Sequence, residues 1–147
     1  MVSGSVLLDT DVYGAVYVTP DKAERQGHPV GRWRRALEGV RVFISFQTRA
    51  EVLAGAASSG WGERRMHELR AQLDATPTIT ADVAVVDAYA QLQAACRKAG
   101  HALADKRHAA DRWNAACALA KGIPLLARDG IYVDVPGLAL FGEGDLL

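Results

Sequence analysis

Four acidic residues stand at positions where their side chains could meet and bind a divalent metal ion. Asp9 and Asp129 each follow a short apolar run, Asp111 opens an alanine-rich helical pattern, and Glu51 lies in another helical pattern. In an open parallel sheet the carboxyl ends of the strands share one edge, and ligands bind at that edge. The sequence therefore predicts an acidic pocket there.

Such a pocket has a specific chemistry. Burying one unpaired carboxylate costs several kcal/mol, and several carboxylates together repel one another. A divalent cation removes this conflict, and Mg²⁺ or Mn²⁺ prefers carboxylate and water oxygens. A metal site of this kind can activate water and stabilise the charge that builds on a phosphodiester during attack. We therefore expect Mg²⁺ or Mn²⁺ as the cofactor.

Each acid also has a simpler interpretation when it is taken alone. Asp9 could cap a helix, Glu51 could be a solvated helix residue, and Asp111 could be a first-turn acid that the helix dipole favours. Asp129 could serve a turn with Gly130. The joint placement of the four acids is what favours a shared pocket.

The elements that must position these acids alternate between strand and helix patterns. Apolar segments predict strands at residues 6–8, 42–45, 124–127 and 138–141, with a short extended segment at 77–79. Helical patterns cover residues 10–18, 32–38, 47–57, 61–73, 81–99 and 111–121, with 21–31 a loop or a frayed helix. Thr80 is the expected cap of the longest helix, and Gly100 ends it. This alternation predicts one domain, residues 1–147, with a three-layer α/β/α fold and a mainly parallel sheet.

Composition narrows the class of protein. The 147 residues include 17 basic and 17 acidic ones, and half are hydrophobic. This balance argues against a surface that binds nucleic acid everywhere, although a local basic rim stays open. Cys96 and Cys117 lie in alanine-rich helical patterns, which predicts two buried thiols in a reducing compartment. The N-terminus has neither a basic segment nor an apolar run long enough for a signal peptide or membrane span, so we expect a cytoplasmic protein.

Several segments together resemble the PIN domain, and specifically the ribonuclease toxins of bacterial VapBC toxin–antitoxin pairs. LLDTDVY resembles the opening strand and acid of that family, and ISFQTRAEVLAG matches its spacing through Ser45, Thr48, Glu51 and Gly55. DRWNAACALAKGIPLLARDGIY resembles its acid, alanine helix, strand and second acid, with Tyr132 at an aromatic position. VPGLAL resembles its closing strand. The resemblance spans nearly the whole chain.

The resemblance implies a metal-dependent endoribonuclease that cuts RNA, often tRNA or rRNA, and is silenced by a VapB-type antitoxin. It implies that Asp9, Glu51, Asp111 and Asp129 are the metal-binding acids, and that Thr10 and Thr48 orient them. It also implies a homodimer. We expect the antitoxin in a groove formed by the helix after the first strand and the segments 32–38 and 61–73.

The chain departs from the family pattern at some positions. Asp11 stands where the family often has Asn, and Asn114 stands where a large aliphatic residue is usual. Cys117 replaces a frequent Thr, and Ala127 replaces the Thr that commonly precedes the last acid by two residues. The last change removes a hydroxyl that would support Asp129. None of them removes a carboxylate.

Two further acids and the basic residues have open roles. Asp105 is expected to cap the helix that begins near Lys106, with a peripheral place at the metal as the alternative, and Asp11 could be a cap or a pocket residue. Arg112 and Arg128 adjoin proposed ligands and are the favoured RNA contacts. The other basic residues considered are Arg32, Arg34, Arg35, Arg64, Arg65, Lys106 and Arg107.

Two other functions fit parts of the sequence. A haloacid dehalogenase-type phosphatase would use Asp9 as nucleophile and Asp11 as acid, but no convincing lysine lies between its two motifs and Tyr13 is out of place. A non-catalytic RNA- or protein-binding module would keep the fold without turnover. The full set of four acids argues against it, because a pure binder gains nothing from clustered repulsion.

Overall fold

The centre of the fold is a parallel sheet in the computed structural model, in which residues 4–142 are described. Within those residues the sheet has four strands in the order β3-β2-β1-β4, and every pair is parallel. The strands are β1 (Ser5–Leu8), β2 (Arg41–Ser45), β3 (Thr78–Ile79) and β4 (Leu125–Leu126). The predicted parallel α/β fold is confirmed.

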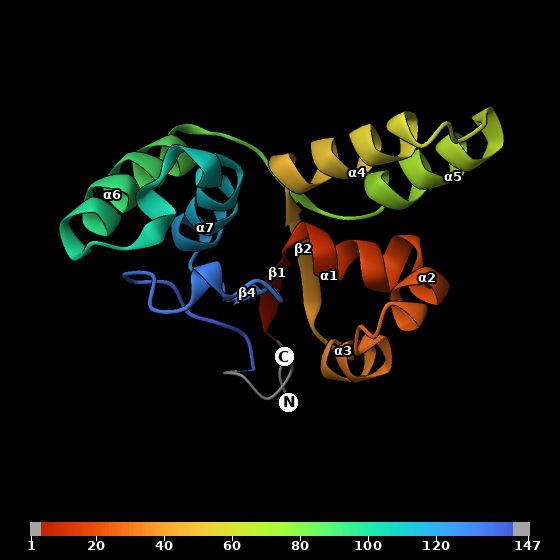
Figure 1. Ribbon diagram of the computed structural model, residues 1–147, viewed down its shortest axis with the longest axis horizontal. Coiled ribbons are helices and arrows are strands. Elements are labelled where there is room, and N and C mark those ends of the chain that lie inside the picture. Colours follow the sequence, from red (N-terminus) through yellow and green to blue (C-terminus); the bar gives the residue numbers. More distant parts are fainter. Residues whose placement is uncertain (1–3, 143–147) are drawn as a thin grey trace.

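Helices cover both faces of the sheet (Figure 1). One face carries α1 (Thr10–Tyr13), α2 (Pro20–Arg25) and α3 (Val30–Ala36), and the other carries α6 (Val83–Ala99) and α7 (Ala109–Lys121). Beyond the carboxyl ends of β1 and β2 lie α4 (Phe46–Ser58) and α5 (Glu63–Asp74), which pack with the first layer. The result is the predicted α/β/α sandwich.

The first strand explains why the sheet is buried on both faces. Its side chains alternate, as they do in any strand. Val6 and Leu8 belong to the core cluster under α1 to α5, whereas Leu7 belongs to the cluster under α6 and α7. All three side chains have no exposed surface. A central parallel strand therefore needs a continuous apolar run, and this one ends directly at Asp9.

The boundaries of some elements differ from the prediction. The helix expected up to Val18 is split into α1 and a π-helical stretch, η1 (Gly14–Val18), and the segment 21–31 contains most of α2. Asp82, not Thr80, caps α6, because its carboxylate accepts the N–H of Val85 at 2.9 Å. The expected strand 138–141 makes only one parallel bridge, from Leu140 to Leu125.

The predictions for the end of the longest helix and for the two cysteines are confirmed. Gly100 and Gly122 adopt left-handed conformations and end α6 and α7, where a residue without a Cβ is least strained. Cys96 and Cys117 are free, buried thiols. Three short 3-10 helices complete the described chain, η2 (Ala102–Ala104), η3 (Lys106–His108) and η4 (Gly130–Tyr132). Among the described helices, none has the length and apolar character needed to cross a membrane.

Candidate active site

Asp9 lies at the carboxyl end of β1, where its backbone N–H donates to the Leu126 carbonyl of β4 at 3.0 Å. Its side chain is only 6% exposed. Although Asp9 holds the N-cap position of α1, its carboxylate makes no capping hydrogen bond. Instead Oδ1 accepts from Nδ2 of Asn114 at 2.6 Å and from the Tyr132 hydroxyl at 3.3 Å. The structure therefore excludes the simple cap and turns this carboxylate toward α7 and η4.

The Asp111 carboxylate lies beside the same Tyr132 hydroxyl that contacts Asp9. The Tyr132 hydroxyl lies 3.2 Å from Oδ1 of Asp111, and Nδ1 of His108 lies 3.0 Å from Oδ2 of the same carboxylate. A phenol has one proton and can satisfy only one of the two acids at a time. Two carboxylates from opposite ends of the chain thus share a single neutral donor.

Burial and like charge make it energetically unfavourable to ionise both Asp9 and Asp111. Burial, with smaller contributions from the charges of Asp111 and Asp11, raises the pKa of Asp9 to about 7, although hydrogen bonds from the Thr10 backbone and from Tyr132 lower it. The pKa of Tyr132 is also raised, first by burial and then by the two acids. Within residues 4–142 no Lys or Arg forms an ion pair with Asp9 or Asp111. No described Lys or Arg therefore offsets negative charge on the pair, and the basic side chain in contact with it is His108, at Asp111.

Glu51 reaches this region from α4 through two hydroxyls. The Thr10 hydroxyl donates to Oε1 of Glu51 at 3.1 Å and lies 3.0 Å from the Thr48 hydroxyl. Thr48 is fully buried and Glu51 is exposed. The two threonines therefore hold the third acid beside the residue that follows Asp9, without bringing it into contact with Asp9.

Asp129 has a different place. Its side chain is exposed, and Oδ1 accepts the N–H of Ile131 at 2.9 Å, so that it caps η4. This is the turn role that the sequence allowed for Asp129 alone. The capped turn carries Tyr132 back to Asp9 and Asp111, so Asp129 supports the pair through the backbone that it fixes.

The residues present fit a hard divalent cation. Mg²⁺ is usually bound by one or two protein carboxylates and keeps several waters, and its remaining places are often taken by substrate phosphate. Asp9 and Asp111 supply such a pair. In the described part of the chain, no three His, Cys, Asp or Glu side chains are arranged as a complete metal site. The structure thus offers a two-carboxylate core, with Glu51 linked through Thr10 to the residue that follows Asp9.

Arg112 and Arg128, the two favoured RNA contacts, differ sharply in exposure. Arg112 is 4% exposed, and its guanidinium donates to the carbonyls of Leu103 and Asp105, at 2.7 and 2.6 Å, and to the Tyr89 hydroxyl. Its donors are therefore committed inside the protein, which is the arrangement of a structural residue. Arg128 is exposed and its Nη1 lies 2.8 Å from Nδ1 of His28.

The two further acids are both exposed. Asp105 caps η3 by accepting the N–H of Arg107 at 3.1 Å, the role that the sequence favoured. Asp11 lines a small hollow of about 180 Å³ together with Thr10, Lys22 and His28. Neither makes a hydrogen bond to Asp9 or Asp111 in the described structure.

Three polar residues at the site escaped the sequence prediction. The sequence marks Asn114 only as a departure from the family pattern and Tyr132 only as an aromatic position, and it indicates no role for His108. A signal existed for Asn114. An amide in the middle of a buried, alanine-rich helix face must have a partner, because an unsatisfied buried polar group is costly.

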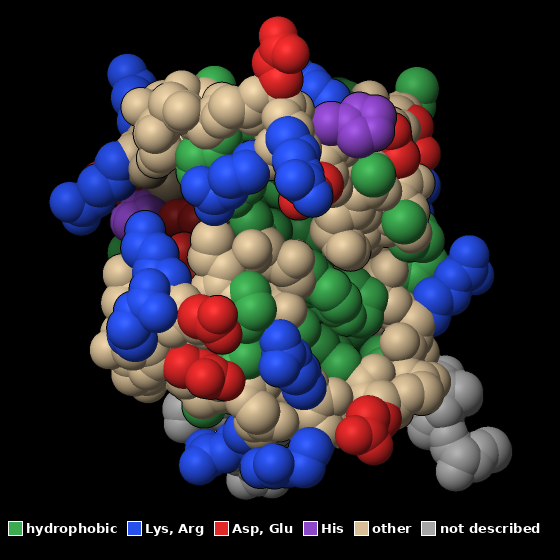
Figure 2. Space-filling view, turned by 90° about the vertical axis from the view of Figure 1, so that its right-hand side faces the viewer, with side chains coloured by type: hydrophobic (Ala, Val, Ile, Leu, Met, Phe, Trp, Pro, Cys, Tyr) green, Lys and Arg blue, Asp and Glu red, His purple; other side chains and the backbone are tan. Residues whose placement is uncertain are grey.

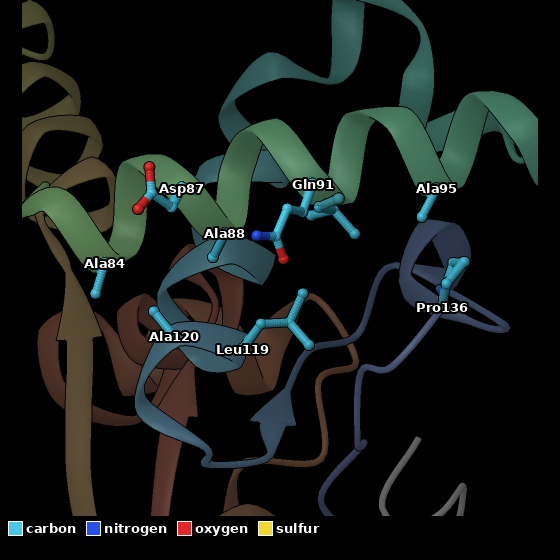
Figure 3. A pocket seen from close by; sticks show the side chains of 9 residues that line it. Ala84, Asp87, Ala88, Gln91, Ala95, Leu119, Ala120 and Pro136 are labelled. Atoms are coloured by element: carbon cyan, nitrogen blue, oxygen red, sulfur yellow. The ribbon is translucent and has the colours of Figure 1, made fainter.

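A larger hollow lies away from the acids (Figure 3). It measures about 480 Å³ and lies between α6 and α7, with Pro136 at its other side. Its lining is mostly alanine and leucine side chains, with Asp87 as the one acid. This lining has no paired carboxylates, so the hollow is not a second metal centre.

The sequence between residues 6 and 138 matches the model of the PIN domain. The chain belongs to the PIN domain family. This membership confirms the family resemblance found in the sequence and replaces the phosphatase interpretation. No curated protein is similar enough in sequence to count as a match.

Solved structures named VapBC, VapBC2 and FitAcB share the fold. The DNA-bound VapBC of Salmonella typhimurium has a TM-score of 0.69 at 20% identity, covering 95% of this chain and 97% of that one. FitAcB of Neisseria gonorrhoeae has a TM-score of 0.68 at 23% identity, covering 92% and 96%. VapBC2 of Rickettsia felis, bound to a promoter DNA fragment, has a TM-score of 0.68 at 19% identity, covering 92% and 96%. At these identities the likeness establishes the fold.

Proposed function

We propose that this protein is a metal-dependent endoribonuclease, the toxin of a type II toxin–antitoxin pair. The observation that carries the proposal is the pairing of Asp9 and Asp111 across the Tyr132 hydroxyl, at the carboxyl edge of the sheet, where no Lys or Arg of residues 4–142 forms an ion pair with either acid. Membership of the PIN family supports it, as does the likeness to VapBC and FitAB complexes.

Asp9 and Asp111 would hold Mg²⁺ or Mn²⁺, with Glu51 and Asp129 as further proposed ligands. When bound, the cation activates water and stabilises charge on a phosphodiester. The chain's own groups prepare the site. Tyr132 donates to the paired carboxylates, and Thr10 fixes the rotamer of Glu51 through its hydroxyl. Such support matters because a loosely held carboxylate positions a metal poorly.

RNA, with tRNA and rRNA as the proposed targets, would approach over a basic margin. Arg128 lies against His28, and Lys22 lines the same small hollow as His28, Thr10 and Asp11. In the described chain neither Arg128 nor Lys22 forms an ion pair with an acid. Positive side chains beside an acidic metal site suit a substrate whose backbone carries one negative charge per nucleotide. We propose Arg128 as the RNA contact.

A groove suited to an antitoxin lies next to the acids. Two hollows of about 240 and 250 Å³ share Val18 and Trp61 and run between η1, α4 and α5. Figure 2 shows this side of the molecule, with apolar side chains in a central depression and Lys and Arg side chains around it. The α3 segment does not line these hollows, contrary to the sequence-based expectation, and α4 takes its place.

The first hollow begins at Thr10 and Glu51, so a chain lying in the groove would reach the acids. We therefore propose that a VapB-type antitoxin lays an apolar helix into the groove. Such a helix would bury its apolar face and leave its polar face in water. Inhibition would follow from the continuity of the groove with the site.

The test is incubation of the purified protein with total RNA, with and without Mg²⁺ or Mn²⁺, followed by mapping of the RNA ends. We expect discrete cuts that need the metal and that vanish in Asp9→Asn and Asp111→Asn. RNA or partner binding without any cutting by the parent protein would contradict the nuclease and favour a non-catalytic binding module.

A further inference from the structure

A chain of buried hydrogen bonds runs from the N-terminus of α4 to the Asp9 carboxylate. Oγ of Ser45 accepts the N–H of Thr48 at 3.1 Å and so caps α4. The Ser45 hydroxyl donates to Oδ1 of Asn114, and Nδ2 of Asn114 donates to Oδ1 of Asp9 at 2.6 Å. Ser45 is fully buried and Asn114 is 1% exposed. We refer to Thr48 N–H, Ser45, Asn114 and Asp9 as the relay.

The direction of every bond in the relay is fixed. An ionised Asp9 carboxylate can only accept, so the Asn114 amide turns its NH₂ toward Asp9 and its oxygen toward Ser45, whose hydroxyl donates to it. The amide NH₂ then faces Asp9, and an NH₂ group can only donate. The reverse orientation would place the amide oxygen against a carboxylate oxygen. Oδ1 of Asp9 is therefore held as an acceptor.

We propose that Asn114 is a positioning residue that fixes the rotation of the Asp9 carboxylate, so that this acid is ready to bind the cation. The inference rests on the proposed function. Asn114 and Tyr132 approach the same oxygen, Oδ1, from two different elements, α7 and η4. A large aliphatic residue, which the family resemblance leads one to expect at position 114, would fill the space but would donate nothing. Groups that orient metal ligands typically change metal affinity ten- to a hundredfold.

The relay also connects Asp9 to the helix that carries Glu51. Ser45 caps α4 at one end of the relay, and Thr48, on the first turn of α4, meets Thr10 through a second, hydroxyl contact of 3.0 Å. Two separate routes therefore run from α4 to Asp9 and its neighbour Thr10. A shift of α4 along its axis would break both, so the relay fixes the helix and the carboxylate together.

The test compares Asn114→Leu with the parent protein and with Cys117→Ala, a buried change about one turn further along α7. The dissociation constant of Mn²⁺ is measured by isothermal titration calorimetry on the protein without RNA, and kcat and KM are measured on the RNA substrate. We expect a ten- to hundredfold weaker Mn²⁺ affinity and a lower kcat with unchanged KM in Asn114→Leu. Cys117→Ala should match the parent. Parental Mn²⁺ affinity in Asn114→Leu would overturn the inference.

A second pair of variants tests the relay even if Asn114→Leu does not fold. Ser45→Ala removes the group that orients the amide, whereas Ser45→Thr keeps a hydroxyl at the cap. Weaker Mn²⁺ binding in Ser45→Ala with recovery in Ser45→Thr supports the relay, and equal affinity in both contradicts it. The outcomes also separate the two proposals. A parent that binds Mn²⁺ but cuts no RNA contradicts the nuclease while the affinities still decide the relay, and a parent that binds no divalent cation contradicts both.

Discussion

The Asp9 carboxylate combines deep burial with two acidic neighbours, and its ionisation should be visible in the stability of the metal-free protein. The folded state raises its pKa from 3.8 to about 7. Between these values the folded chain binds more protons than the unfolded chain, so the free energy of unfolding falls as the pH rises through this window. The cost levels off above pH 7.

We expect Asp9→Asn to remove this pH-dependent loss of unfolding free energy. In the presence of a chelator, the parent should lose a few kcal/mol of unfolding free energy between about pH 4 and pH 7, at about 1.4 kcal/mol per pKa unit. The substituted protein should show a smaller decline. Urea unfolding at several pH values measures both, and identical pH profiles would contradict the assigned burial of this charge.

Arg128 provides a second prediction at the scale of one residue. If it contacts RNA, Arg128→Ala should weaken RNA binding and reduce the slope of affinity against salt by about one ion, with little change in metal affinity. Arg64→Ala is the matched control, because Arg64 is an exposed arginine paired with Glu68 on α5. Equal losses in both variants would show a nonspecific charge effect instead.

The residues of the site were predictable to different degrees. Asp9 and Asp111 could be found because a strand end and a helix start place a carboxylate by local geometry alone. The partner of Asn114 could not be predicted, because its hydrogen bond to Asp9 joins residues 105 positions apart and depends on how α7 crosses the sheet. Arg112 adjoins a ligand in sequence, yet the packing of α7 turns it inward.

At the scale of elements, α4 offers a test of the antitoxin groove. Gly55 lines the groove, and a Cβ built on it meets no atom within 4 Å. Gly55→Ala should therefore stabilise the protein by roughly 0.5–1 kcal/mol, because alanine loses less backbone freedom in a helix. Chemical denaturation measures the gain, and a loss of stability would show that the space is not free.

A large side chain at position 55 should block binding of the antitoxin. Gly55→Phe should project a ring into the groove and abolish binding of the antitoxin, while RNA cleavage continues. Co-purification with a VapB-type antitoxin, to be sought in the neighbouring reading frame, measures binding, and Gly55→Ala serves as the small control. Unchanged binding in Gly55→Phe would place the antitoxin elsewhere on the surface.

Long periodic segments such as α6 and α7 could be read from the sequence, whereas short elements could not. The cap of α6 is Asp82 and not Thr80, because the helix begins at Val83 and the Asp82 carboxylate reaches the N–H of Val85. The segment 138–141 has a strand-like pattern, but only Leu140 pairs with β4, itself two residues long. Local pattern thus predicts the kind of element better than its ends.

At the scale of the molecule, the order of strands and helices was predictable because apolar runs and helical patterns alternate along the chain. The exposed surfaces were not predictable, because the packing of the layers decides which faces stay uncovered. Helix α6, which lines the hollow of Figure 3, also carries two exposed valines, Val83 at 77% and Val86 at 46% exposure. Exposed apolar side chains on a helix that lines such a hollow suit contact with a second copy.

We expect Ala84→Arg, which would place a long cation in that hollow, to convert a dimer to a monomer in light scattering after size-exclusion chromatography. Ala90→Arg, at an exposed position outside the lining of the hollow, is the control. A parent protein that is monomeric at high concentration would contradict the homodimer.

The central claim is that Asp9 and Asp111 together bind a divalent cation. Anomalous diffraction from crystals grown with Mn²⁺ tests it most directly, because the metal is located without reference to activity. We predict one strong Mn²⁺ peak in contact with both carboxylates, and its loss in Asp111→Asn. Crystals saturated with Mn²⁺ that show no peak at this pair, or a peak only elsewhere, would contradict the claim.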